Sequence, residues 1–220
     1  NVSYTQSLAA MLPKNPKDMN FEPFVGNIYE EQNFKILLLG ESHHFGKDDM
    51  NDFQKEPLNY KDVTKNVLGN FFDYKNGNSK FYHWMNTFTK FTNIFNNRPV
   101  LREQNEEFWN KLLFYNYVQT PVDSARKSPT PAQFKNSHES FVKIIDELKP
   151  NLIIVWGYRL WRNMPKNECL TRKDEIDFYN NIPVLVIPHP ASSKFDYSMN
   201  QFINKYIDTI KKHCSQHHRN

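Results

Sequence analysis

The chain has 220 residues, 39% of them hydrophobic and 15% aromatic, and its formal net charge is +4 at pH 7. This composition excludes a wholly disordered chain, and the mild positive charge permits a nucleic-acid partner without requiring one. Its two cysteines exclude both a disulfide framework and an iron–sulfur cluster on four thiolates, and no apolar run is long enough to span a membrane.

Four short apolar segments are predicted to be strands. In chain order they cover residues 35–39, 112–115, 152–156 and 184–187. Three of them are continuous runs rich in Ile, Leu and Val, which is typical of strands buried on both faces of a parallel sheet.

Helical patterns separate and follow these strands. Apolar side chains recur at helical spacing over residues 132–149 and again over 199–212. The segment from about 48 to 110 is long for one crossover and contains two aromatic-rich helical patterns, at 63–74 and 81–95. We therefore expect a helical insertion here.

The alternation of strands and helices predicts an α/β fold, as a three-layer α/β/α sandwich with a four-stranded, mainly parallel sheet. At this length we expect one domain over residues 1–220. We also expect a cytoplasmic location, because cysteines are few and no leader pattern opens the chain. We expect no contact with membranes, because no apolar run is long enough to span one, and we expect no cofactor.

Polar residues follow every predicted strand. The four segments are 40–46, 116–122, 157–159 and 189–193. Because ligands of open parallel sheets bind beyond the carboxyl ends of the strands, these segments are the candidate site. Glu41 is the only acidic residue among them.

The ordered set of motifs resembles the uracil-DNA glycosylase superfamily over roughly residues 34–210. Residues 40–44, Gly-Glu-Ser-His-His, are similar to the motif after the first strand of that family. Asn116 matches the Asn that reads the flipped base, residues 156–157 match a Trp-Gly pair of one branch, and residues 189–192 are similar to the final His-Pro-Ser motif.

This resemblance implies cleavage of an N-glycosidic bond in DNA, with the base turned out of the stack. Such a reaction needs a carboxylate to position water beside the sugar and a donor to the departing base. The resemblance assigns Glu41 and His189 to these catalytic roles. It implies substrate contacts for Ser42, His43, His44, Phe45, Phe81 and Asn116, and DNA contacts for Arg159, Ser192, Ser193, Lys194 and Phe195, the last two as a wedge beside the flipped base.

The sequence departs from the family pattern at three neighbouring positions. Ser42 replaces an Asp that orients water in one branch, His43 replaces a Pro, and His44 replaces a Tyr that excludes 5-substituted pyrimidines. The loss of that Tyr, together with the helical insertion, makes room for a larger base. We therefore expect a glycosylase for uracil or a modified pyrimidine, acting in DNA repair or in defence against phages.

Two other classes of function remain open. One is a catalytically silent module on the same fold that grips DNA or a protein partner. The other is a hydrolase with a Ser/Glu–His arrangement in the Gly40-Glu41-Ser42-His43 loop, although no Asp lies two residues before His189.

Structural roles are also open for the candidate residues. Glu41 would then bind a loop amide, Asn116 would brace a loop, Arg159 would cap a helix and Phe81 would pack in the core. Glu41 and His43 offer two metal ligands on one side of a strand end, but no third ligand is identifiable, so no metal is expected.

Overall fold

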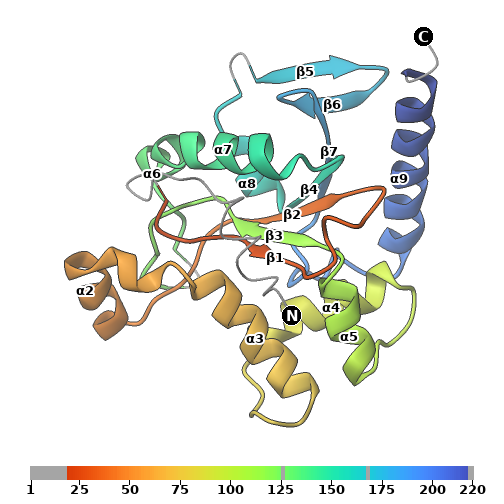
Figure 1. Cartoon of the computed structure of the whole chain (residues 1–220). Coiled ribbons are helices and arrows are strands. Elements are labelled where there is room, and N and C mark those ends of the chain that lie inside the picture. The colour runs from red at the N-terminus through yellow and green to blue at the C-terminus, as the bar shows by residue number, and fades with distance from the viewer. Residues whose placement is uncertain (1–18, 125–126, 167–168, 218–220) are drawn as a thin grey trace.

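The computed structural model describes residues 19–124, 127–166 and 169–217, and these residues form a seven-stranded mixed sheet flanked by helices (Figure 1). The strand order is β1-β3-β2-β4-β7-β6-β5. Its centre consists of four mutually parallel strands, which correspond to the four predicted segments. They are β2 (Ile36–Gly40), β3 (Leu113–Asn116), β4 (Leu152–Trp156) and β7 (Ile182–Ile187).

The prediction of a four-stranded sheet is wrong, because three antiparallel strands extend its two edges. β1 (Phe24–Val25) pairs with β3, while β6 (Ile176–Tyr179) lies between β7 and β5 (Leu170–Lys173). β1 has two residues, and β5 carries the exposed polar sequence Thr-Arg-Lys. Short or charged edge strands lack the apolar run that identifies a buried strand.

Successive residues of the central strands face opposite layers. Leu37 and Leu39 of β2 belong to one buried core, and Ile36 and Leu38 belong to the other. Side chains of a strand alternate between the two faces of the sheet, so a strand with a core on both sides needs apolar residues at every position. The continuous apolar runs follow from this arrangement.

One face of the sheet is covered by α6 (Pro131–Asn136), α7 (His138–Leu148) and α8 (Tyr158–Asn163) (Figure 1). The helix predicted over 132–149 is thus divided in two. At the junction the buried Ser137 hydroxyl accepts from the Gln119 amide at 2.9 Å and donates to the Gln133 carbonyl at 2.7 Å. These bonds tie the break to the segment after β3.

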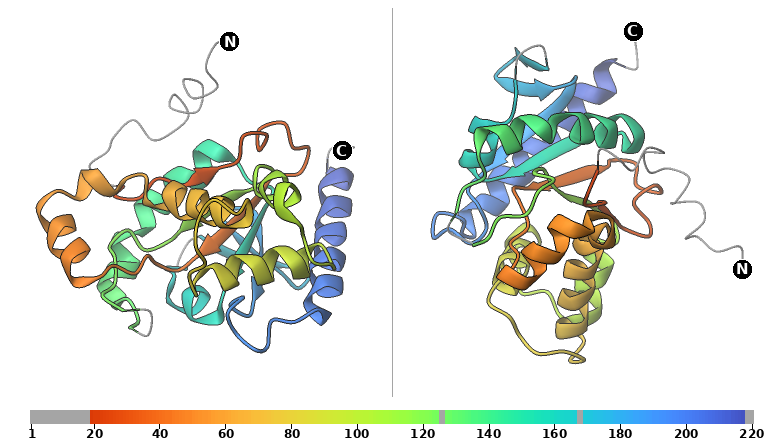
Figure 2. Two further views of the ribbon diagram at one scale, coloured as in Figure 1. Left: turned by 90° about the horizontal axis from the view of Figure 1, so that it is seen from below. Right: turned by 90° about the vertical axis from the view of Figure 1, so that its left-hand side faces the viewer.

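Four helices pack on the other face (Figure 2): α3 (Val63–Lys75), α4 (Met85–Phe95), α5 (Arg102–Trp109) and α9 (Ser198–His217). The segment predicted as a helical insertion also contains α2 (Lys47–Lys55) and the 3-10 turn η2 (Pro57–Tyr60). Its helical character is therefore confirmed, although α4 begins at Met85 rather than at residue 81. None of the helices described is both long and apolar enough to cross a membrane.

Candidate functional site

The chain after β2 runs beside the chain after β3, and this pairing sets the direction of the first motif. The amide of Tyr117 donates to the carbonyl of Gly40 at 2.9 Å, and the amide of Val118 donates to the carbonyl of Glu41 at 2.8 Å. The motif therefore continues the path of the strand, and its side chains leave the carboxyl edge of the sheet alternately on opposite sides.

Glu41 forms a bidentate ion pair with Arg159, which lies in α8 just after β4. The Nε of Arg159 donates to Oε2 of Glu41 at 2.9 Å, its Nη2 donates to Oε1, and its Nη1 donates to the Ser128 hydroxyl at 2.8 Å. The side chain of Glu41 is 11% exposed and that of Arg159 is 46% exposed. Hydrogen bonding to Glu41 raises the pKa of Arg159, so the guanidinium stays charged.

His189 follows β7 and is held in one tautomer. Its Nδ1 accepts a hydrogen bond from the Ala191 amide at 3.1 Å, which leaves the proton of the neutral ring on Nε2. Desolvation lowers the pKa of His189; the Glu41 carboxylate opposes this shift, while Arg159 and His44 add to it. His189 is therefore a neutral imidazole at neutral pH, and its Nε2–H donates to no residue in the described ranges.

Four ionisable side chains thus meet where three strands end. Glu41 and His44 follow β2, Arg159 follows β4 and His189 follows β7. Desolvation lowers the pKa of His44 as well; the charge of Glu41 opposes this shift, and the charge of Arg159 adds to it. We call these four residues the strand-exit cluster.

His43 and Asn116 form a second polar group, which is buried. His43 Nε2 lies 3.0 Å from the Thr64 hydroxyl of α3, and Asn116 Nδ2 lies 3.2 and 3.3 Å from the two nitrogens of the His43 ring. Desolvation lowers the pKa of His43 to about 3, so its ring stays neutral. Glu41 and His43 therefore have different partners, and the Asn116 amide nitrogen faces the protein interior.

Gly40 permits this position of Asn116. A Cβ atom on Gly40 would lie 2.1 Å from Oδ1 of Asn116, which is closer than any real contact. The two residues are register partners across β2 and β3. The glycine of the first motif therefore makes room for the amide that the second strand delivers.

A polar cavity of about 240 Å³ lies near this group but does not contain the predicted site. Gln119 joins the two, because its Nε2 donates to the Asn116 carbonyl at 3.1 Å. Glu41, Asn116 and His189 are absent from the lining. The lining residues are Asn20, Gln119, Thr120, Gln133, Asn136, Ser137, Glu139 and Ser140.

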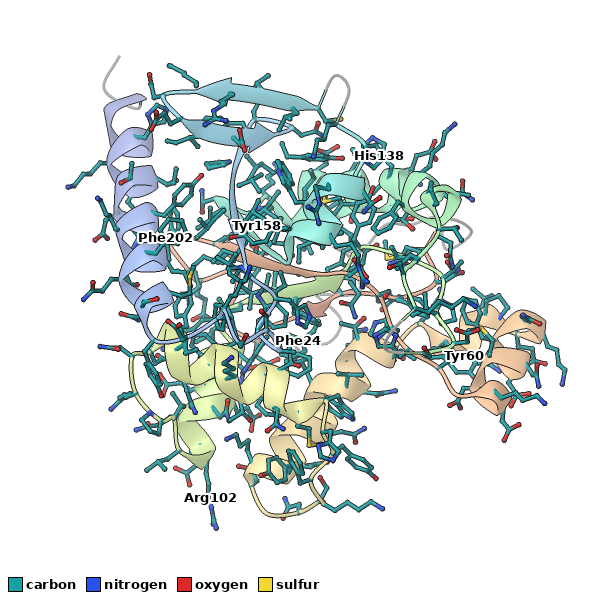
Figure 3. The ribbon with its side chains drawn as sticks, turned by 180° about the vertical axis from the view of Figure 1, so that it is seen from behind. Phe24, Tyr60, Arg102, His138, Tyr158 and Phe202 are labelled. Atoms are coloured by element: carbon teal, nitrogen blue, oxygen red, sulfur yellow. The ribbon has the colours of Figure 1, made fainter. Side chains whose placement is uncertain are left out.

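Two predicted aromatic contacts are wrong, because both rings are buried in the protein. Phe45 packs in a small core with Phe21 and Phe53, and its ring lies 5.0 Å from that of Tyr60, which Figure 3 labels. Phe195 is fully buried and stacks on Phe91 of α4 at 6.0 Å. Phe195 therefore anchors its loop and does not serve as a wedge, whereas the neighbouring Lys194 is exposed.

Phe81 is exposed on the loop between α3 and α4, so its core-packing interpretation fails. Its exposed fraction is 41%, and its neighbours Tyr82 and Trp84 are 45% and 37% exposed. The ring of Tyr82 stacks on that of Trp84 at 6.4 Å, and Lys80 Nζ lies 5.3 Å above the Tyr82 ring. Tyr82 and Trp84 were not among the predicted contacts, although they lie in the same aromatic stretch.

The predicted serines have limited roles in this structure. Ser192 shapes the turn after His189, since its amide donates to the His189 carbonyl at 2.7 Å, and Ser193 is exposed. Lys90 of α4 fixes this turn by donating to the Ser192 carbonyl at 2.7 Å. No pattern in the sequence predicts this contact. Within the described ranges no hydrogen bond joins the Ser42 hydroxyl to a histidine.

No group of three or more His, Cys, Asp or Glu side chains in the described part of the chain is arranged to hold a metal ion. No protein-family model matches this chain, and no curated protein matches it either.

Proposed function

We propose that this protein is a DNA glycosylase that releases uracil or a modified pyrimidine from DNA. The strand-exit cluster is the observation that carries the proposal. It combines a carboxylate with a neutral imidazole whose Nε2–H donates to none of the described residues, at the edge of the sheet where α/β folds bind ligands.

Glu41 acts on the sugar side of the reaction. As the bond between sugar and base breaks, its electron pair leaves with the base, and water attacks the sugar carbon. Glu41 orients this water, accepts its proton and stabilises the positive charge on the sugar. Arg159 occupies one lone pair on each oxygen of Glu41, and each oxygen keeps another for water.

His189 acts on the base side. Negative charge grows on the base carbonyl during cleavage, and Nε2–H of His189 donates a hydrogen bond to that oxygen. The Ala191 amide holds the ring in this tautomer. The lowered pKa of His189 keeps the ring neutral, so the ring can donate this hydrogen bond without first losing a proton.

Exposed aromatic and basic side chains on the loop before α4 and on the loop after His189 suit a DNA partner. Phe81, Tyr82 and Trp84 offer faces on which bases can stack, and Lys80 adds positive charge beside them. Lys194 is exposed on the loop that follows His189. Phosphate contacts from such lysines are independent of base sequence.

A silent DNA- or protein-binding module is the second candidate, because the polar groups of the site are already paired within the protein. Both oxygens of Glu41 are bound to Arg159, and the amide nitrogen of Asn116 is bound to His43. The Ser/Glu–His hydrolase has less support, because within the described residues no hydrogen bond joins the Ser42 hydroxyl to a histidine. Labelling of Ser42 by a fluorophosphonate tests it directly.

A panel of DNA substrates distinguishes these candidates. Duplexes and single strands that carry uracil, 5-hydroxymethyl or glucosylated pyrimidines are incubated with the protein, and abasic sites are scored. The glycosylase proposal expects abasic sites on at least one substrate. Tight, salt-dependent binding to every substrate without base release would instead identify a binding module.

A further inference from the structure

A cysteine, a histidine and a tyrosine lie together outside the strand-exit cluster. Cys169 Sγ is 3.8 Å from Nε2 of His138, and Nδ1 of His138 is 2.9 Å from the Tyr179 hydroxyl. Figure 3 labels His138, which begins α7; Cys169 precedes β5 and Tyr179 ends β6.

The hydrogen bonds of this group can run in only one direction. The Tyr179 hydroxyl donates its single proton to the Pro165 carbonyl at 3.0 Å, because a carbonyl only accepts. The hydroxyl oxygen therefore accepts from Nδ1–H of His138, which leaves a lone pair on Nε2, the nitrogen nearest the thiol. Burial and the nearby Cys169 sulfur raise the pKa of Tyr179, so the hydroxyl keeps its proton and this order holds.

This order is that of a nucleophile, a base and a group that orients the base. Tyr179 is fully buried, and its ring packs 5.5 Å from Phe141, so it provides a fixed support for the imidazole. His138 and the free thiol of Cys169 are only half-buried. Both residues are therefore partly open to solvent, so a small reagent can approach the pair.

We propose that Cys169 is a base-activated thiol that hydroperoxides oxidise to a sulfenic acid. The thiol proton moves to Nε2 of His138 while the sulfur attacks one oxygen of the peroxide. The bond between the two peroxide oxygens breaks, and the departing oxygen takes the proton from the imidazolium. With hydrogen peroxide the products are the sulfenic acid and one water molecule; the sulfur loses two electrons, and a thiol reductant restores it.

The two cysteines of the chain allow a clean test. Cys214→Ser leaves Cys169 as the single thiol, and its rate of reaction with hydrogen peroxide at neutral pH is followed through trapping of the sulfenic acid by dimedone. We expect a rate roughly tenfold above that of free glutathione under the same conditions. A rate no higher than that of glutathione overturns the proposal.

Substitutions in the same single-thiol background test the role of the imidazole. His138→Asn should lower the rate roughly tenfold, and Tyr179→Phe should lower it several-fold, since it removes the acceptor for Nδ1–H. His83→Asn, on the loop before α4, is the matched control and should leave the rate unchanged. A folded His138→Asn protein that reacts as fast as its parent contradicts the proposal; if that variant does not fold, the Tyr179→Phe rate decides in the same way.

Discussion

Gly40 shapes the site because it has no Cβ atom. Its missing Cβ leaves space for Oδ1 of Asn116, and Asn116 in turn contacts His43, which is bonded to Thr64 of α3. The first and second motifs thus meet at a backbone position where an added Cβ would force Asn116 to move.

Gly40→Ala should therefore displace Asn116 or shift the backbone that carries the neighbouring Glu41. Because Glu41 is a positioned group of the proposed reaction, a shift of about an ångström should slow base release by roughly a hundredfold. Gly69→Ala is the matched control, because no atom lies within 4 Å of a Cβ at that helical position. That change should leave base release intact and raise the free energy of unfolding by about 0.5–1 kcal/mol. Single-turnover assays and urea titrations measure both effects; equal rates for Gly40→Ala and the wild type would contradict this account.

His43 links stability to pH. Its pKa is about 3 in the folded protein and near 6.5 when unfolded, so between these values the unfolded chain binds one more proton. Stability must then fall as the pH decreases through this range, by up to about 1.4 kcal/mol per pH unit from this group.

His43→Asn removes this proton and should flatten the decline. The free energies of unfolding of variant and wild type, measured by urea titration, should converge as the pH falls from 6.5 towards 3. Parallel curves over that range would show that His43 is not held neutral in the folded protein.

Among the strands, burial decided what could be predicted. β2, β3, β4 and β7 have cores on both sides and therefore carry the apolar runs that reveal them. β5 carries the exposed sequence Thr-Arg-Lys, and β1 has only two residues. Both are strands because they form hydrogen bonds with a neighbouring strand, and the local sequence does not reveal that neighbour.

The loop before α4 was expected to be its first turn, because residues 81–84 continue the aromatic pattern of the helix. In the structure Phe81, Tyr82 and Trp84 are exposed instead. Periodicity identifies apolar side chains, but it does not distinguish a ring packed in the core from one presented to a partner.

Tyr82→Ala and Trp84→Ala should each weaken binding of single-stranded DNA by about 1–3 kcal/mol if a base stacks on that ring. Leu101→Ala is the control, since Leu101 is 71% exposed but is not aromatic. Fluorescence anisotropy with a labelled oligonucleotide measures the three affinities. Equal losses in all three variants would assign the effect to general surface change.

The fold brings together residues that are far apart in the sequence and that no local sequence pattern links. Glu41 and Arg159 are 118 positions apart and form an ion pair only because β2 and β4 are neighbours in the sheet. Both residues were predicted at strand exits, but Arg159 was expected to contact DNA or to cap a helix, not to pair with Glu41. Phe195 was misassigned for a related reason, since an apolar residue in a polar loop has the same signature whether it anchors the loop or protrudes from it.

The strand-exit cluster and the Cys169 group lie in different parts of one fold. Glu41 and His189 extend from the carboxyl ends of parallel strands, whereas Cys169 and Tyr179 belong to the antiparallel hairpin at one edge. Loss of one group should leave the other working, so Cys214→Ser and Cys169→Ser proteins should retain base release.

The most direct measurement is single-turnover base release by Glu41→Gln and His189→Ala, with DNA affinity measured on the same preparations. We predict that each substitution slows release by about a hundredfold or more while the dissociation constant for DNA stays nearly unchanged. Wild-type release rates in both variants, on a substrate that the wild type cleaves, would contradict the assignment of the carboxylate and the imidazole to catalysis.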